Sequence, residues 1–395
     1  MVLPEQKNAA ARPVVLQILP SLVTGGVERG TVDMAATLKE AGWLPLVVSN
    51  GGPMVRELDR LGVKHIQLPV HSKNPLVIKA NIGRLEAVIR EHGVDIVHAR
   101  SRAPAWSAYY AAQATGAHFV TTFHGTYNRG PFGLKTPYNA IMTRGEKIIA
   151  ISNFIAGHMR DAYQTDPERI RVVHRGIDID KFDAAKVSQE RIIQLANRWR
   201  LPDGYAVVML PGRLTRWKGQ EVLIEALAML GRRDLRCLLV GSDQGRTAYS
   251  EELQAMVKRK GLTDIVHIVG ECNDMPAAYM LTDVVVSAST DPEAFGRVIV
   301  EAQALGRPVV ATDNGAGREN VLDGQTGLLI PPKDPAALAL ALDRVLAIGP
   351  EERAERAALA IDFVRKNFTR RLMGERTLSV YAEVLGLDHA GSAAA

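Results

Sequence analysis

Two glutamates, Glu293 and Glu301, are the residues whose type and spacing most strongly indicate chemistry. They lie in the stretch 291–301, DPEAFGRVIVE, and residues 298–306 are otherwise almost wholly apolar. This pattern predicts a helix over 297–305 in which Glu301 is embedded among apolar neighbours. A carboxylate buried there is costly unless it is hydrogen-bonded, and ribose hydroxyls are a natural partner. The alternative is an ordinary helix start with one stray acid.

The residues between the two acids predict a site built from backbone groups. Glu293 and the N–H groups of Ala294, Phe295 and Gly296 are expected to hold sugar hydroxyls. The N–H groups of Arg297 and Val298 begin the predicted helix, and a helix N-terminus favours a negative charge such as phosphate.

Two cations follow an apolar run in the second half of the chain. The stretch 211–219, PGRLTRWKG, comes directly after the predicted strand 206–210. Ligands of open α/β sheets bind outside the carboxyl ends of the strands. Arg213 supplies a forked donor and Lys218 a point charge, so we expect them to clamp a diphosphate. The alternative is a basic surface loop.

The first half carries weaker signals. Gly25 and Gly26 join the predicted strand 14–19 to the predicted helix 26–41, where free N–H groups attract anions. His124 follows a strand near residue 120, and a histidine there can hydrogen-bond the transferring sugar; the alternative is a structural histidine. His98 and two nearby arginines, at 100 and 102, stand after another strand and could meet an anionic acceptor; the alternative is that they are only surface residues.

Strand-length apolar runs alternate with helical patterns through the whole chain. The strands are expected at 14–19, 46–48, 65–68, 95–97, 119–120, 147–151 and 170–173, and again at 206–210, 237–240, 265–268, 284–286 and 308–311. Continuous Val/Ile/Leu runs are typical of strands buried on both faces of parallel sheets. The sequence therefore predicts an α/β protein.

We expect a flexible N-terminus over 1–12, a first domain over 13–185, a second over 186–365, a C-terminal helix over 366–387 and a flexible tail over 388–395. A G-x-G-x-x-G fingerprint is absent after the first strand, which argues against a nicotinamide dehydrogenase.

Charge and composition narrow the partners. Residues 1–184 hold 22 Lys and Arg against 16 Asp and Glu, a net charge of +6, whereas the whole chain has +5. This half is expected to face an anionic acceptor, the alternative being a charge bias of a solvated surface. The loop 128–135, NRGPFGLK, could touch a membrane or an amphiphilic acceptor, or it is an ordinary surface loop. No basic run interleaved with aromatics suggests nucleic acid. Two cysteines, no secretory signal and no membrane-length apolar run predict a cytoplasmic protein, peripheral on the inner membrane at most.

Together these motifs resemble glycosyltransferase family 4 over most of residues 13–385. The resemblance rests on the Glu293/Glu301 pair with the following stretch 302–312, AQALGRPVVAT, on the 212–219 loop and on Gly25-Gly26. It implies a GT-B fold, in which two Rossmann-like domains with doubly wound parallel sheets face a cleft and a C-terminal helix crosses back to the first domain.

The resemblance also implies roles for individual residues. Arg213 and Lys218 should bind the donor diphosphate, Glu301 the ribose and Glu293 the transferring sugar. Gly25 and Gly26 should approach the phosphate, and His124 should contact the donor sugar. The backbone at Cys272 should contact the nucleobase, with Met275 close by. His124, Arg213, Lys218 and Glu293 form the expected catalytic set.

The resemblance further implies a retaining, metal-independent reaction that needs no cofactor beyond a nucleotide-diphosphate sugar. The expected function is transfer of a hexose, from a donor that we take to be UDP-linked, to a glycan or an anionic glycolipid of the lipopolysaccharide or cell envelope. The alternatives are a nucleotide-sugar epimerase of the same fold and a non-catalytic binding or scaffold protein.

Overall fold

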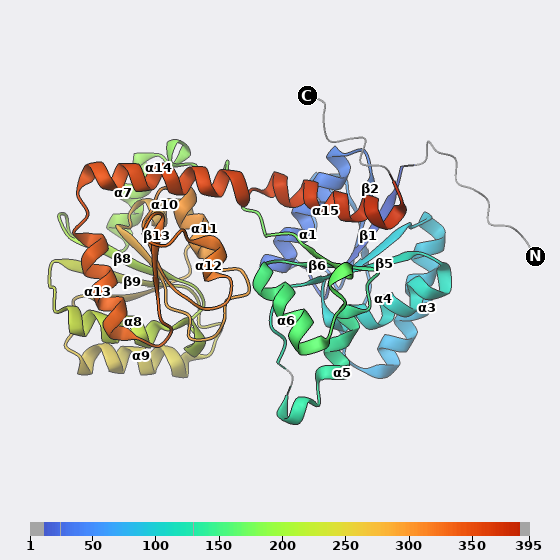
Figure 1. The fold of residues 1–395 in the computed structure, drawn as a ribbon, viewed down its shortest axis with the longest axis horizontal. Helices are drawn as coiled ribbons and strands as arrows, with labels where there is room; N and C mark the ends of the chain where they lie inside the picture. Colours follow the sequence, from blue (N-terminus) through green and yellow to red (C-terminus); the bar gives the residue numbers. More distant parts are fainter. Residues whose placement is uncertain (1–11, 24, 129, 388–395) are drawn as a thin grey trace, which may run out of the picture. The chain divides into compact units, whose positions relative to one another are not determined.

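The computed structural model describes residues 12–387 except Thr24 and Arg129 (Figure 1). The flexible ends expected at 1–12 and 388–395 therefore lie almost wholly outside the described residues. The chain divides into two compact units, an N-terminal unit of residues 1–174 with 371–395 and a C-terminal unit of residues 175–370. The chain passes from the first unit to the second between residues 174 and 175, before the boundary at residue 185 that the sequence predicts.

The N-terminal unit is built on a seven-stranded parallel sheet in the order β3-β2-β1-β4-β5-β6-β7. Every residue of β1 is buried, as expected for a strand covered on both faces. The strands are β1 (Val14–Ile18), β2 (Leu44–Ser49), β3 (Lys64–Gln67), β4 (Ile96–Ala99), β5 (His118–Phe123), β6 (Lys147–Ala150) and β7 (Ile170–Val172).

The C-terminal unit repeats this plan with a six-stranded sheet in the order β10-β9-β8-β11-β12-β13, again parallel throughout. Its strands are β8 (Ala206–Pro211), β9 (Leu235–Val240), β10 (Val266–Gly270), β11 (Val284–Ser287), β12 (Val309–Thr312) and β13 (Gly327–Ile330). The sequence prediction missed β13, an edge strand of four residues that follows a glycine-containing turn.

Helices cover both faces of each sheet (Figure 1). In the N-terminal unit these are α1 (Gly26–Glu40), α2 (Val55–Arg60), α3 (Pro75–His92), α4 (Arg102–Thr115), α5 (Thr136–Asn139) and α6 (Asn153–Tyr163). The C-terminal unit has α7 (Gln189–Arg198), α8 (Gln220–Leu230), α9 (Thr247–Arg259), α10 (Met275–Met280), α11 (Arg297–Ala304), α12 (Gly317–Asn320), α13 (Pro335–Leu346) and α14 (Pro350–Asn367).

The last helix, α15 (Arg370–Leu385), returns to the N-terminal unit. Its residues Met373, Val380 and Tyr381 join a core cluster with Val15 and Ile96 of the first sheet. The expected crossing of a C-terminal helix back to the first domain is therefore confirmed.

The two points where the chain passes between the units are hydrogen-bonded to each other. Ile177 N donates to Phe368 O at 2.8 Å, and Arg370 N donates to Ile177 O at 2.9 Å. Gly176 stands so close to Thr369 that an added Cβ would lie 2.3 Å from its carbonyl oxygen. The outgoing and returning segments are thus held side by side.

The strand orders determine where sites can form. In both sheets the direction of strand progression reverses between the first and the fourth strand of the unit, β1 and β4 or β8 and β11. The connections that leave these strands depart to opposite sides, which opens a crevice at their carboxyl ends.

Candidate functional site

Two predicted site residues form a nearly buried ion pair at the switch point of the C-terminal unit. Lys218 lies in the loop after β8, and Glu293 lies in the loop after β11. Lys218 Nζ is 2.5 Å from Glu293 Oε1, and the two side chains are only 15% and 11% exposed. Ser289 Oγ donates to the same Oε1 at 2.6 Å. Both donors thus converge on one oxygen, which leaves Oε2 to accept from a ligand.

Close backbone approach brings these two loops together. Gly219 has φ 74°, and an added Cβ would lie 1.9 Å from the carbonyl oxygen of Ala288. Next to it, Thr290 N donates to Trp217 O at 2.8 Å. A residue with a side chain at position 219 would push the loops apart, so this glycine is what allows Lys218 to reach its partner.

Glu301 is the second acid of the pair and is held from two sides. It lies in α11, with 7% of its surface exposed. Tyr279 of α10 donates its hydroxyl to Oε2 at 2.9 Å, and Arg297 Nε donates to Oε1 at 2.6 Å. The cost of burying this carboxylate is offset by these charge-assisted hydrogen bonds.

The backbone between the two acids is fixed by the segment that follows β12. Ala316 N donates to Glu293 O at 2.8 Å, and Asn320 Nδ2 donates to Phe295 O. Gly315, with φ 67°, lies against Glu293, and an added Cβ would approach its carbonyl oxygen to 2.3 Å. The loop 293–296 therefore has a defined course, and its N–H groups precede the start of α11 as the sequence predicts.

Arg213 lies in the same loop as Lys218 but is exposed. Its backbone carbonyl accepts a hydrogen bond from the buried Gln220 side chain at 3.0 Å, so the main chain is anchored. Its guanidinium makes no ion pair with any residue in the described ranges. By contrast, Arg216 of this loop points to the surface and pairs with Glu252 at 2.5 Å.

The residues predicted to meet a nucleobase lie at the end of β10. Cys272 is half-buried two residues after that strand, and burial is the largest cause that raises the pKa of its thiol. Met275 begins α10, whose N-cap Asp274 is held by Arg191 through two hydrogen bonds of 2.6 and 2.8 Å. This segment has a fixed backbone, as recognition through main-chain groups requires.

Three predicted residues belong to the N-terminal unit. Gly25 caps α1 and Gly26 begins it, at the carboxyl end of β1, while His124 directly follows β5. The side chain of Glu28 folds over Gly25, with Oε2 2.2 Å from the place of an added Cβ. These residues thus stand at strand ends on one sheet, apart in the chain from the Glu293/Glu301 pair.

The neighbouring His98 is an internal residue. It is fully buried, with Nδ1 2.6 Å from the Tyr381 hydroxyl of α15 and Nε2 2.7 Å from Thr122 Oγ1. Arg100 is 6% exposed and donates to Gln17 Oε1 at 3.0 Å. The idea that His98 and Arg100 contact an acceptor at the surface is therefore wrong, because both are part of the core.

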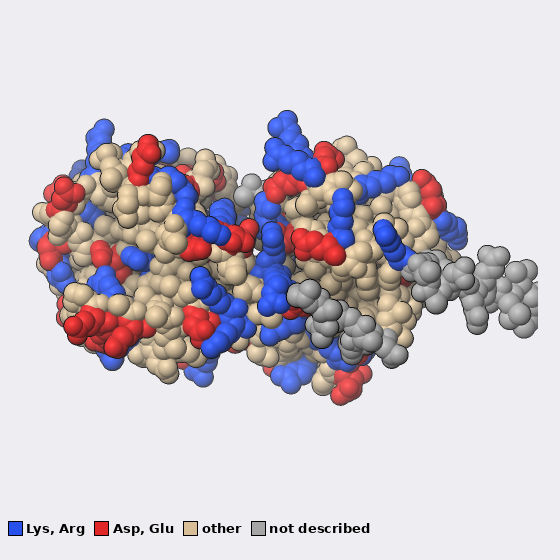
Figure 2. All heavy atoms as spheres, turned by 90° about the horizontal axis from the view of Figure 1, so that it is seen from above, with Lys and Arg blue, Asp and Glu red and all other residues tan. Residues whose placement is uncertain are grey.

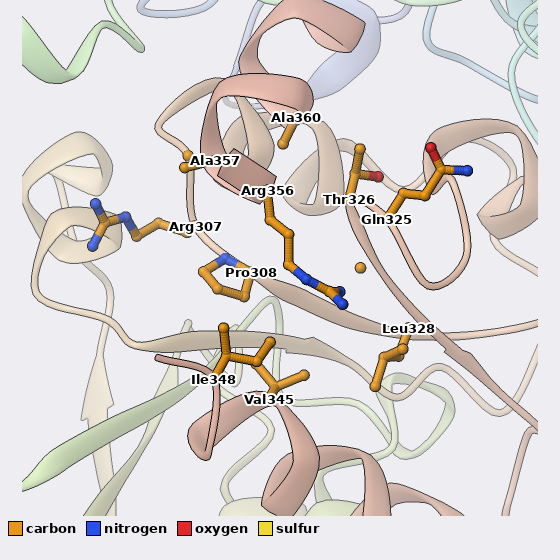
Figure 3. Close-up of a pocket in the computed structure, with 12 residues that line it drawn as sticks. Arg307, Pro308, Gln325, Thr326, Leu328, Val345, Ile348, Arg356, Ala357 and Ala360 are labelled. Atoms are coloured by element: carbon orange, nitrogen blue, oxygen red, sulfur yellow. The ribbon is translucent and has the colours of Figure 1, made fainter. Parts of the chain in front are cut away.

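Other features lie away from this constellation. A pocket in the C-terminal unit (Figure 3) is lined by Pro308, Leu328 and Val345 among others, near the amino ends of β12 and β13. No predicted site residue lines it. Within the described ranges, no cluster of three or more His, Cys, Asp or Glu side chains is suited to a metal ion. No helix there is long and apolar enough to cross a bilayer.

Sequence reasoning missed the residues that hold the site residues in place. Ser289, Tyr279 and Asn320 each contact the acids or the loop between them, yet none stands in a spacing that points to a function. The one available signal was the position of Ser289, three residues after the end of the predicted strand 284–286. Tyr279 is 22 positions from Glu301, and only the packing of α10 against α11 brings the pair together.

Comparison with known proteins identifies the family. A model described as "Glycosyl transferases group 1" matches residues 192–360, and one described as "Glycosyltransferase Family 4" matches residues 24–181. A D-inositol 3-phosphate glycosyltransferase of Xylanimonas cellulosilytica is 30% identical over 77% of this chain and 75% of its own. The chain belongs to glycosyltransferase family 4. It is thus an enzyme of the transferase class.

Solved structures agree with this family and with the GT-B fold. A glycosyltransferase from Rickettsia africae is 39% identical, with a TM-score of 0.88 over 95% of this chain and 99% of its own. Anabaena HepE in complex with UDP is 25% identical, with a TM-score of 0.80 over 94% of this chain and 100% of its own. The predicted family and fold are both confirmed.

Proposed function

We propose that this glycosyltransferase transfers a hexose from UDP-hexose with retention of configuration and without a metal ion. The acceptor would be an anionic glycolipid or glycan in lipopolysaccharide or other cell-envelope polysaccharide synthesis. One observation carries the donor half of this proposal. Two ion pairs, Lys218–Glu293 and Arg297–Glu301, converge at the switch point of the C-terminal sheet.

These pairs are suited to exchange partners when a donor binds. A diphosphate competes for Lys218, and a sugar hydroxyl competes for Glu293, so one ligand satisfies both members of the pair. Arg213, exposed in the same loop, supplies a second cation for the leaving diphosphate. Charge that develops on the leaving group is then stabilised where the loop 293–296 turns its N–H groups into α11.

The chemistry follows from this charge distribution. The bond between the anomeric carbon and the diphosphate oxygen breaks, and the acceptor oxygen bonds to the anomeric carbon on the same face. The acceptor proton passes to the departing diphosphate. In this scheme Glu293 accepts a hydrogen bond from a sugar hydroxyl through Oε2 and does not act as a nucleophile, while Ser289 continues to donate to Oε1.

The UDP assignment is supported by HepE, whose solved complexes contain UDP. A thermal-unfolding screen against UDP-, GDP- and ADP-hexoses tests it. A ligand present at a hundred times its Kd stabilises the folded chain by about 2.7 kcal/mol, so the correct nucleotide raises the unfolding temperature most. Equal shifts for all three nucleotides would contradict the UDP assignment.

The acceptor is expected to carry negative charge. The net charge of +6 on residues 1–184 supports this, and so does the phosphate in the name of the Xylanimonas relative. On the face drawn in Figure 2, however, Lys and Arg side chains are interspersed with Asp and Glu on both units. An acceptor site is therefore expected to be a local cluster of cations.

One loop of the N-terminal unit fits an amphiphilic acceptor or a membrane surface. Phe132 is fully exposed, with φ 52°, and Leu134 is 76% exposed next to Lys135. Arg129 of this loop lies outside the described residues. We expect binding to anionic liposomes at low salt that weakens as salt is added, because charges at a surface are screened. Binding that is absent at low salt would remove the membrane contact from the proposal.

Transfer itself is tested with donor and candidate acceptors in the presence of EDTA. A retained anomeric configuration in the product, read from its NMR coupling constants, and full activity without divalent metal are the expected results. Conversion of the donor sugar to its epimer without any acceptor would instead identify the epimerase alternative.

A further inference from the structure

Tyr279 is a buried tyrosine that contacts one of the two acids of the donor site. Its side chain is completely buried, and its hydroxyl lies 2.9 Å from Glu301 Oε2. We infer that Tyr279 is a positioning residue, which aims the Glu301 carboxylate at the ribose of the bound nucleotide. This inference rests on the proposed function, because it takes Glu301 as the ribose-binding group.

The surroundings of Tyr279 hold its hydroxyl in a single place. The ring lies in the core beside Phe182, with the ring centroids 6.2 Å apart. Buried tyrosine hydroxyls nearly always have a hydrogen-bond partner, and here the partner is a carboxylate that is itself 7% exposed. Desolvation, and after it the charge of Glu301, raises the pKa of Tyr279, so the phenol keeps its proton and donates.

Glu301 is held differently on its two oxygens. Oε2 faces the buried Tyr279, whereas Oε1 accepts from Arg297, whose side chain is 38% exposed. A ligand can displace an exposed arginine one turn away on the same helix, but it cannot displace a hydroxyl from the core. Tyr279 therefore keeps the carboxylate in one orientation while Arg297 yields Oε1 to a ribose hydroxyl.

Loss of the hydroxyl has a specific consequence. In Tyr279→Phe the ring still fills its place in the core, but the carboxylate of Glu301 loses its fixed contact and can turn fully towards Arg297. Binding energy is then lost only where a ligand uses Glu301. A purely structural role would instead weaken every nucleotide to the same extent.

The test compares UDP with 2′,3′-dideoxy-UDP by isothermal titration calorimetry on the full chain. Wild type is expected to bind UDP about tenfold or more tightly than the dideoxy ligand, because hydrogen bonds to charged groups are the strong ones. In Tyr279→Phe, UDP should weaken by about tenfold, with the dideoxy ligand nearly unchanged. In a Glu301→Gln background, the same change should have little further effect on UDP.

Tyr381→Phe is the matched control. Tyr381 is also fully buried and hydrogen-bonded, but to His98 in the N-terminal unit. Its loss should leave the ratio of the two affinities at the wild-type value. A drop in that ratio equal to the drop in Tyr279→Phe would mean that any loss of a buried hydroxyl has this effect, and would overturn the inference.

The remaining outcomes are separable. Equal weakening of both ligands in Tyr279→Phe, or no weakening of either, overturns the positioning role while leaving the donor site intact. Wild type that binds both ligands equally overturns the ribose assignment of Glu301, and wild type that binds neither overturns the proposed function as well.

A second measurement applies if Tyr279→Phe does not fold. Site-specific 3,5-difluorotyrosine at position 279 keeps both the hydroxyl and the ring. Its fluorine NMR resonance should shift with UDP and stay in place with the dideoxy ligand. A resonance that responds equally to both would contradict the inference.

Discussion

The two units place polar side chains at equivalent points of equivalent sheets and use them differently. At the switch point of the C-terminal unit, Lys218 and Arg297 pair with acids and keep 15% and 38% of their side chains exposed. In the N-terminal unit, His98 on β4 bonds to α15 and is fully buried. The first arrangement is partly open to solvent, as the proposed exchange of its partners for a ligand requires, whereas the second is enclosed in the core.

The difference teaches that a buried polar cluster at a strand end is not sufficient to identify a site. Both clusters follow apolar strands, and both contain a tyrosine with no exposed surface, Tyr279 or Tyr381. What separates them is whether one side of the cluster reaches solvent. His98 is fully buried and both of its ring nitrogens are hydrogen-bonded, to Tyr381 and Thr122, so it serves the attachment of the C-terminal helix.

Of the residues in the two clusters, Lys218 is expected to give the largest effect on activity when it is replaced. Lys218→Ala removes a cation from the leaving diphosphate and leaves Glu293 without its ion pair, so we expect turnover to fall by about 100- to 1000-fold. Steady-state transfer kinetics check this. Arg216→Ala, in the same loop but paired on the surface with Glu252, is the control and should stay within about twofold of wild type. An equal loss of turnover in the two variants would mean that the loop has only a structural role, and would contradict the role given to Lys218.

Gly219 tests whether the C-terminal site depends on close approach of its loops. In Gly219→Ala the new Cβ would meet the Ala288 carbonyl, and φ is 74°, so we expect the unit to lose about 1–3 kcal/mol of stability and most of its activity. Denaturant unfolding followed by an activity assay measures both. Gly324→Ala is matched, because φ is 75° but no atom lies within 4 Å of the new Cβ. A loss as large at position 324 would assign the effect to backbone conformation alone.

A substitution of Tyr381 tests whether the hydrogen bonds of His98 in the N-terminal unit contribute to stability alone. Tyr381→Phe leaves His98 Nδ1 without its partner in the core, which is expected to cost about 1–3 kcal/mol. Faster hydrogen exchange at the amides of β1 and β4 reports this loss. UDP affinity should not change, in contrast to Tyr279→Phe. Weaker UDP binding without faster exchange would reverse the roles that we assign to the two tyrosines.

The smallest effect is expected from the titration of His98. Burial, and after it the charge of Arg100, lowers the pKa of His98 well below its ordinary value of 6.5. Below pH 6.5 the unfolded chain therefore binds a proton that the folded chain does not, so the stability of the N-terminal unit falls as the pH is lowered. The slope of stability against pH below 6.5 should be shallower in His98→Gln. An identical slope in that variant would place the titration elsewhere.

The sequence by itself determined the fold class and singled out the residues of the proposed donor site. Buried strands such as Val14–Ile18 show as continuous apolar runs, and their alternation with helices implies parallel sheets. Glu293 and Glu301 stand out because a charged group in an apolar segment needs a reason. Such signals are local in the chain, which is why they can be read without coordinates.

Tertiary structure alone decided which polar residues belong to the site. His98 lies in β4 and Lys218 in the loop after β8, and only packing shows that His98 bonds to Tyr381, 283 residues away, while Lys218 pairs with Glu293. Tyr279 reaches Glu301 and Asn320 reaches Phe295 through contacts between separate elements. Hydrogen bonds between distant segments leave no periodicity in the chain, because each depends on how whole elements pack.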